Sequence, residues 1–185
     1  SNLSLFYDDL KYLNKVNLKG EIFKIPFTFK INKDFINTSY TTLINSKKLK
    51  LIFKNKSFKE GKSINGLNEL AILNSKLITK YNVKDKIFLF KSKNSQLINN
   101  SIDYKGKLNL YPFNLDLKID LEKINLEKLL DTNSVFFELI KSRRLFNENL
   151  STTITLNSKN IFRNKLFESL TIFYNQKNGL INLNR

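Results

Sequence analysis

Cysteine and histidine are both missing from this chain of 185 residues, and so are methionine and tryptophan. Without cysteine there is no disulfide framework and no thiolate nucleophile. Without histidine the chain also lacks the commonest general base and most transition-metal sites. We therefore predict no metal site, no cofactor and no enzymatic activity.

Carboxylates are the remaining candidates for acid–base chemistry, and only Asp8/Asp9 and Asp116/Asp120 form tight acidic groupings. Asp116 and Asp120 are four residues apart on a predicted strand, which separates them by about 13 Å at ~3.3 Å per residue. That distance is too long for a shared proton, and Lys118 lies between them. The pattern favours a solvated charged face over a catalytic pair.

Proline and glycine are scarce, with two and five residues, so no flexible linker or domain boundary is visible. No run of about 18 apolar residues occurs, which excludes a membrane-spanning helix within the sequence. The opening SNLSLFYDDL contains two acids and lacks the apolar core of a signal peptide. We predict one β-rich domain over residues 1–185, cut from a longer protein whose targeting segment lies outside this chain.

Positive charge is abundant: 32 basic residues face 16 acidic ones, for a net charge of +16. Such a balance suggests nucleic acid or an anionic membrane as a partner. Almost all of the basic residues are lysine, however, and Asn, Ile, Lys and Phe are heavily used throughout. A/T-rich codons produce the same composition, so the charge alone does not identify a partner.

Alternation of apolar and polar residues is the dominant pattern, and it predicts strands with one apolar face. KIPFTFKI, KKLKLIFKNKSF, NLDLKIDL and STTITL all show it, with Asn- and Gly-rich turns roughly every 10–15 residues, as in antiparallel meanders. The predicted inner face consists of Ile25, Phe27, Phe29, Ile31, Leu49, Leu51, Phe53, Leu115, Leu117, Ile119, Leu121 and Ile154.

Residues 126–146 break the alternation, because Leu126, Leu129 and Leu130 recur at helical spacing and a second apolar patch follows Ser134. The expected fold is therefore mainly β, a curved antiparallel sheet shaped as a groove or half-open barrel, with one short helical insertion around 126–146.

Three functions remain open from these residues. Alternating strands most often form half of a sandwich core, so a structural or protein-interaction β domain is one interpretation. A nucleic-acid-binding module is less favoured, because Phe53 and Phe58 alternate with lysines and a stacking platform needs both types on one face. A ligand-binding apolar face is the third.

A family resemblance bears on this choice. The stretch YKGKLNLYPFNLDLKIDLEKINLEKLL, followed by LFNENLSTTITL and a hairpin ending in Asn-Gly, resembles the C-terminal region of the AsmA-like family of bacterial envelope proteins. It covers residues 101–185 best, and the first hundred residues match only in style. The matching positions are Gly106, Lys107, Pro112, Phe113, residues 145–151, Asn178 and Gly179.

The resemblance implies a long curved sheet with a hydrophobic groove, anchored in the inner membrane of Gram-negative bacteria and extending into the periplasm. Such proteins are implicated in phospholipid transport towards the outer membrane. The implied partner is phospholipid, held by its acyl chains along the twelve inner-face residues, without nucleic acid. The anchor lies outside this chain, and an open sheet edge could pair with missing sequence or with another copy.

Overall fold

The computed structural model describes residues 2–8, 10, 13–22, 24–98, 100–129, 151–163, 167–177 and 180–184. These residues are almost entirely strands of open, curved and mainly antiparallel sheet, which confirms the predicted fold class. The chain divides into two compact units. Unit 1 comprises Ser1–Asp85 and Phe90–Asn99, and unit 2 comprises Lys86–Leu89 and Asn100–Arg185.

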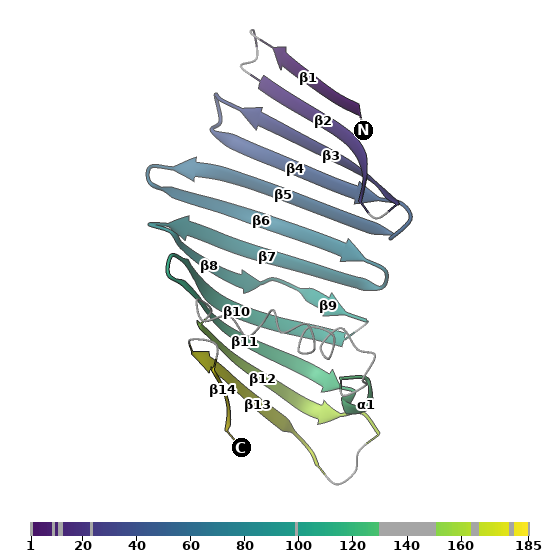
Figure 1. Cartoon of the computed structure of the whole chain (residues 1–185), viewed down its shortest axis with the longest axis vertical. Helices are drawn as coiled ribbons and strands as arrows, with labels where there is room; N and C mark the ends of the chain where they lie inside the picture. Colours follow the sequence, from purple (N-terminus) through teal and green to yellow (C-terminus); the bar gives the residue numbers. More distant parts are fainter. Residues whose placement is uncertain are drawn as a thin grey trace. The chain divides into compact units, whose positions relative to one another are not determined.

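Unit 1 is an antiparallel meander in which each strand pairs with the next one along the chain (Figure 1). A short strand, β9 (Ser95–Leu97), pairs with β7 (Ser75–Lys84) through Gln96 and Lys76. Strand β8 (Ile87–Ser92) contributes residues to both units. The seven strands of the meander are β1 (Asn2–Asp8), β2 (Leu13–Ile22), β3 (Ile25–Asp34), β4 (Ser39–Ser46), β5 (Leu51–Glu60), β6 (Ser63–Ile72) and β7 (Ser75–Lys84).

Tight turns connect these strands, and residues with positive φ close them. Gly61 has φ 57°, and Thr38, Lys50 and Leu73 adopt similar values without being glycine. The turn between β4 and β5 occupies residues 47–50 and contains Leu49, so the predicted extension of the alternation back to Leu49 is wrong. The reason is that Ser46 pairs with Leu51, and the four residues between them form the reversal.

Unit 2 contains β10 (Asn100–Leu110), β11 (Phe113–Ile124), β12 (Ser151–Ile161), β13 (Leu170–Lys177) and β14 (Leu180–Asn184). The hairpin predicted at Asn178 and Gly179 is confirmed, since β13 and β14 pair antiparallel. β11 and β12 pair in parallel, in contrast to the antiparallel pairs β10–β11, β12–β13 and β13–β14 (Figure 1). Parallel neighbours need a long crossover connection, and residues 125–150 lie between these two strands.

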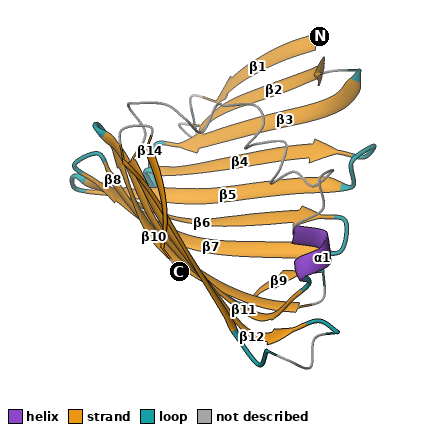
Figure 2. Cartoon of the chain, turned by 60° about the horizontal axis from the view of Figure 1, so that its bottom comes forward, coloured by secondary structure: helices purple, strands orange, loops and turns teal. Residues whose placement is uncertain are grey.

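The predicted helical insertion begins where expected, since α1 spans Leu126–Leu129 (Figure 2). The rest of the predicted segment, residues 130–146, lies outside the described residues. Near the start of the chain, Asn2–Asp8 form strand β1.

Candidate functional site

The strand registers of unit 1 sort its side chains onto two opposite faces. Directly paired residues in antiparallel strands share a face, and alternate residues along a strand do too. The registers from β1 to β7 contain no slip or bulge, so each face is a regular grid of rows that cross the strands. One row, here called the apolar row, consists entirely of apolar residues: Leu3, Leu18, Phe29, Ile44, Phe53, Leu70 and Leu77.

The apolar row crosses seven strands, and at about 4.8 Å per strand spacing it is about 29 Å long. Its side chains are not enclosed: Leu3 is 62% exposed, Leu18 is 38% exposed, and the other five are half-buried. The face that carries this row is called the apolar face. A pocket of about 770 Å³ lies on it, lined by Leu18, Gly20, Glu21, Phe27, Phe29, Ile44, Leu51, Phe53 and Leu70.

Six of the seven inner-face residues predicted in this unit lie on the apolar face. Phe27, Phe29, Leu51 and Phe53 line the pocket, while Ile25 and Ile31 occupy neighbouring rows of the same face. Leu49 is the seventh and lies in a turn.

Sequence reasoning missed several members of the apolar row, namely Leu3, Leu18, Ile44, Leu70 and Leu77. Each belongs to an alternating stretch, so period-two patterning carried the signal. Isoleucine and leucine also occur next to each other in these strands, as in Leu43–Ile44, and only the register shows which of the two lies on the apolar face.

Beyond the apolar row, the same face becomes polar in two steps. The next row on this face holds amide and hydroxyl residues over β4–β7, and this part is called the polar row: Thr42, Asn55, Asn68 and Thr79. Over β1–β3 the same row continues with the apolar residues Leu5, Val16 and Ile31. It is separated from the apolar row by a single pleat, because Phe53 and Asn55 are two residues apart. The row after it is called the tyrosine row: Lys33, Tyr40, Ser57, Gly66 and Tyr81.

A hydrogen bond joins the last two rows. The Tyr81 hydroxyl donates to Asn55 Oδ1 at 2.7 Å. The tyrosine ring reaches across Gly66, where a Cβ atom would lie 2.3 Å from ring carbon Cζ. Glycine at this position therefore allows Tyr81 to lie flat on the sheet and orient the Asn55 amide.

The opposite surface of unit 1, called the lysine face, carries most of the charge. Lys30, Lys54 and Lys80 are exposed on it, and Lys76 forms an ion pair with Glu69 at 2.9 Å that holds the pKa of Glu69 below its ordinary value. Phe58 also lies on this face, so the expectation that both Phe53 and Phe58 point away from the lysines is wrong for Phe58. The two residues are five positions apart, and an odd separation places them on opposite sides.

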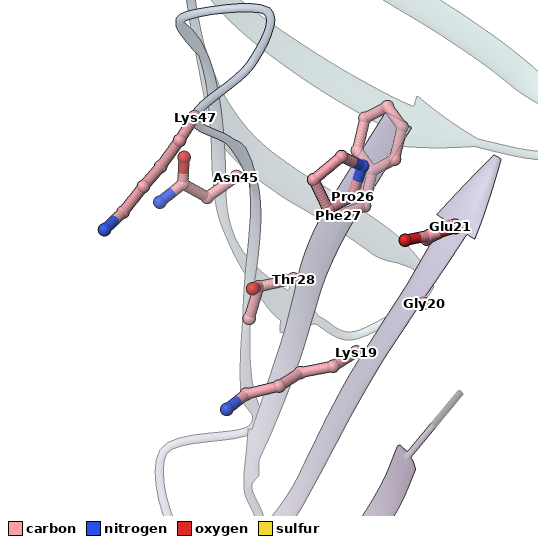
Figure 3. A pocket seen from close by; sticks show the side chains of 8 residues that line it. All are labelled: Lys19, Gly20, Glu21, Pro26, Phe27, Thr28, Asn45 and Lys47. Carbon is pink, nitrogen blue, oxygen red and sulfur yellow. The ribbon is translucent and has the colours of Figure 1, made fainter. Parts of the chain in front are cut away.

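A second pocket, of about 700 Å³, opens on the lysine face near the ends of β2–β4. Figure 3 shows the ammonium groups of Lys19 and Lys47 on the same side as Thr28 and Asn45. Glu21 also lines this pocket, so it combines two cations with one anion. It differs in chemistry from the apolar pocket on the other face.

In unit 2, the five remaining predicted residues share one face. Leu115, Leu117, Ile119 and Leu121 alternate along β11, and Ile154 lies beside Leu117 on β12. Asp116 and Asp120 point to the other side. Sequence reasoning missed further apolar neighbours on the shared face, Ile102, Leu156 and Ile172.

Asp120 of unit 2 is held by two polar partners. Asp120 Oδ1 accepts a hydrogen bond from Asn157 Nδ2 at 2.7 Å and lies 3.5 Å from Lys118 Nζ. Within the described part of the chain, no three acidic side chains gather in a way that could hold a metal ion. Nor does any helix among the described residues reach the length and hydrophobicity needed to cross a membrane.

Comparisons of this chain with known protein families, with curated proteins and with solved structures found no match.

Proposed function

We propose that this protein is a non-enzymatic lipid-binding protein in which the apolar face of unit 1 holds phospholipid acyl chains. The observation that carries the proposal is the apolar row, seven apolar side chains in register that are half-buried or exposed. A row about 29 Å long is comparable to the thickness of a bilayer's hydrocarbon core, about 30 Å, so it is long enough to lie along the whole length of an acyl chain.

The energetics of acyl-chain burial suit such a surface. Each methylene removed from water contributes about 0.8 kcal/mol, so a chain of about 16 carbons gains on the order of 10 kcal/mol before the costs of association. Acyl chains need a continuous apolar floor and no particular side-chain geometry. The pocket volume of about 770 Å³ falls within the range of small-ligand sites, about 300–1,000 Å³.

The wider setting of the proposal comes from the resemblance to AsmA-like proteins in residues 101–185. On that basis the protein acts in the periplasm of a Gram-negative bacterium, anchored to the inner membrane through sequence outside this chain, and supports phospholipid transport to the outer membrane. The lysine face then serves as the solvated outer surface, and its charges discourage edge-to-edge aggregation.

The first test is mass spectrometry of the full chain after expression in bacteria and purification without detergent. Phospholipid at a stoichiometric level supports the proposal. A lipid-free protein that also fails to take up phospholipid from vesicles of phosphatidylethanolamine and phosphatidylglycerol contradicts it.

The second test locates the lipid with a phospholipid that carries a photoreactive group in its acyl chain. Leu70 and Leu67 lie on the same strand and face opposite sides, so Leu67→Asp is a matched control for Leu70→Asp. We expect Leu70→Asp to abolish crosslinking and Leu67→Asp to preserve it. Leu70→Ser provides a milder variant, and circular dichroism verifies that each variant keeps its sheet. Equal crosslinking in the two Asp variants would exclude the apolar face as the site.

A further inference from the structure

Over β4–β7, the apolar face of unit 1 changes from apolar to polar in one direction along the strands. Starting from Leu51 and the apolar row, the strands run through the polar row to the tyrosine row. A phospholipid has the same sequence of chemistry, from acyl chains through ester carbonyls to a phosphate. The match in order provides a way to orient the ligand.

Charge on this face is confined to its polar end. Among the strand residues of β1–β7 whose side chains point to the apolar face, Lys33 and Lys59 are the only charged ones, and both are cations. Lys59 is exposed, whereas Lys33 is half-buried in the tyrosine row. Glu21 lines the apolar pocket at the other end of β2, so the end with Lys33 presents cations without a carboxylate and complements an anionic group.

The Lys33 side chain is held in place by aromatic rings. Its ammonium lies 4.1 Å from the centre of the Phe35 ring and 5.5 Å from that of Tyr40. Cation–π contacts attract the ammonium while leaving its three N–H donors available to an oxygen ligand. The neighbouring carboxylate of Asp34 lies on the other face and accepts two hydrogen bonds from Asn37.

We propose that Lys33 binds the headgroup phosphate of a phospholipid whose ester groups contact the polar row and whose acyl chains lie on the apolar row. This inference rests on the proposed function and adds to it an orientation and a preference for an anionic headgroup. The Asn55 amide, oriented by Tyr81, places a donor group between Lys33 and Phe53, where ester carbonyls would lie.

The test compares two lipids with identical acyl chains, dipalmitoyl phosphatidylglycerol and dipalmitoylglycerol, each with a fluorescent label in one chain. Binding of both is measured on the full chain and on the Lys33→Gln variant. We expect Lys33→Gln to weaken phosphatidylglycerol binding about tenfold, the size of one charged hydrogen bond, and to leave dipalmitoylglycerol binding unchanged. Lys33→Arg should restore most of the affinity.

Two variants serve as controls. Lys30→Gln removes an equal charge from the same strand on the lysine face, and it should change neither affinity. Lys19→Gln tests the polar pocket on the lysine face as the competing phosphate site.

Each remaining outcome contradicts a distinct statement. If both lipids bind and Lys33→Gln affects them equally, the phosphate is not at Lys33. If Lys19→Gln instead reduces phosphatidylglycerol binding selectively, the headgroup lies on the opposite face. If free glycerol phosphate displaces the lipid from the unsubstituted protein, the site recognises phosphate without acyl chains. If neither lipid binds the unsubstituted protein, the proposed function itself fails.

Discussion

The two units are built from the same alternating pattern, yet they bury their apolar residues to different extents. The buried hydrophobic side chains among the described residues are Ile102, Ile124 and Ile161, and all three belong to unit 2. In unit 1 the buried side chains of the described residues are serines, at positions 46, 57 and 95. Of these three, only Ile102 shares the face of Leu121, and the predicted inner-face residues of unit 2 are half-buried like those of unit 1. Alternation therefore specifies which residues share a face, whereas local packing decides which of them are enclosed.

The largest expected difference between the units concerns stability. Ile161 is 7% exposed and lies beside Ile124 in the parallel pair, so Ile161→Ala should lower the free energy of unfolding by about 3 kcal/mol. Ile44 lies in the apolar row and is half-buried, and Ile44→Ala should cost about 1 kcal/mol because less surface returns to water. Urea titrations of the two variants measure both values. Equal losses would mean that the apolar face of unit 1 is as well packed as unit 2.

The sequence was most informative about faces and least informative about neighbours. Eleven of the twelve predicted inner-face residues lie on two apolar faces, since a period of two is read directly from the residues. Leu49 was misplaced because a four-residue turn continues the alternation of the strand that follows it. The parallel pairing of β11 with β12 was unpredictable, because strand direction depends on the connection and not on either strand.

The contacts around Lys33 and Gly66 were only partly predictable from the sequence. Lys30 and Lys33 are three positions apart in KIPFTFKINK, so strand alternation already places them on opposite faces, but only the register brings Tyr40 of β4 beside Lys33. Gly66 resembles an ordinary turn residue in KSINGLNEL, yet it lies inside β6 under the Tyr81 ring. Such contacts join residues that are distant in sequence, and no local pattern encodes them.

Gly66 offers the next test, because it distinguishes close packing at the polar end of unit 1 from the open apolar row. Alanine usually stabilises a strand relative to glycine, but here its Cβ would displace Tyr81 and break the bond to Asn55. We expect Gly66→Ala to destabilise the protein by about 1–2 kcal/mol. In a Tyr81→Ala background the same change should be neutral or stabilising, and a double-mutant cycle by urea titration measures the coupling. Additive effects would show that the ring and the glycine do not interact.

Two buried serines of unit 1 provide a smaller and opposite pair of effects. Ser46 is fully buried and its Oγ has no hydrogen-bond partner, whereas Ser95 Oγ bonds both the amide and the carbonyl of Ile78 on β7. Removing an unsatisfied hydroxyl relieves a desolvation penalty, so Ser46→Ala should raise the free energy of unfolding by about 1 kcal/mol. Ser95→Ala should lower it by about 1 kcal/mol, since two backbone groups lose their partner. Calorimetry of both variants measures these free energies. A lower free energy of unfolding in Ser46→Ala would show that the Ser46 hydroxyl has a stabilising partner.

Tyr174 gives the smallest effect and tests how dry the apolar face of unit 2 is. It shares that face with Ile154, and its hydroxyl donates to Gln176 Oε1 at 2.6 Å. Burial disfavours the phenolate and raises the pKa of Tyr174 above its ordinary value of 10.0. A raised folded-state pKa means that the stabilisation is complete below pH 10 and is lost as the pH rises through the folded pKa.

Urea midpoints should therefore decline above pH 10 more steeply in the unsubstituted protein than in Tyr174→Phe. At neutral pH the substitution should cost about 0.5 kcal/mol for one lost hydrogen bond. Identical alkaline slopes would mean that water reaches Tyr174, and that the face of unit 2 is as open as the apolar row of unit 1.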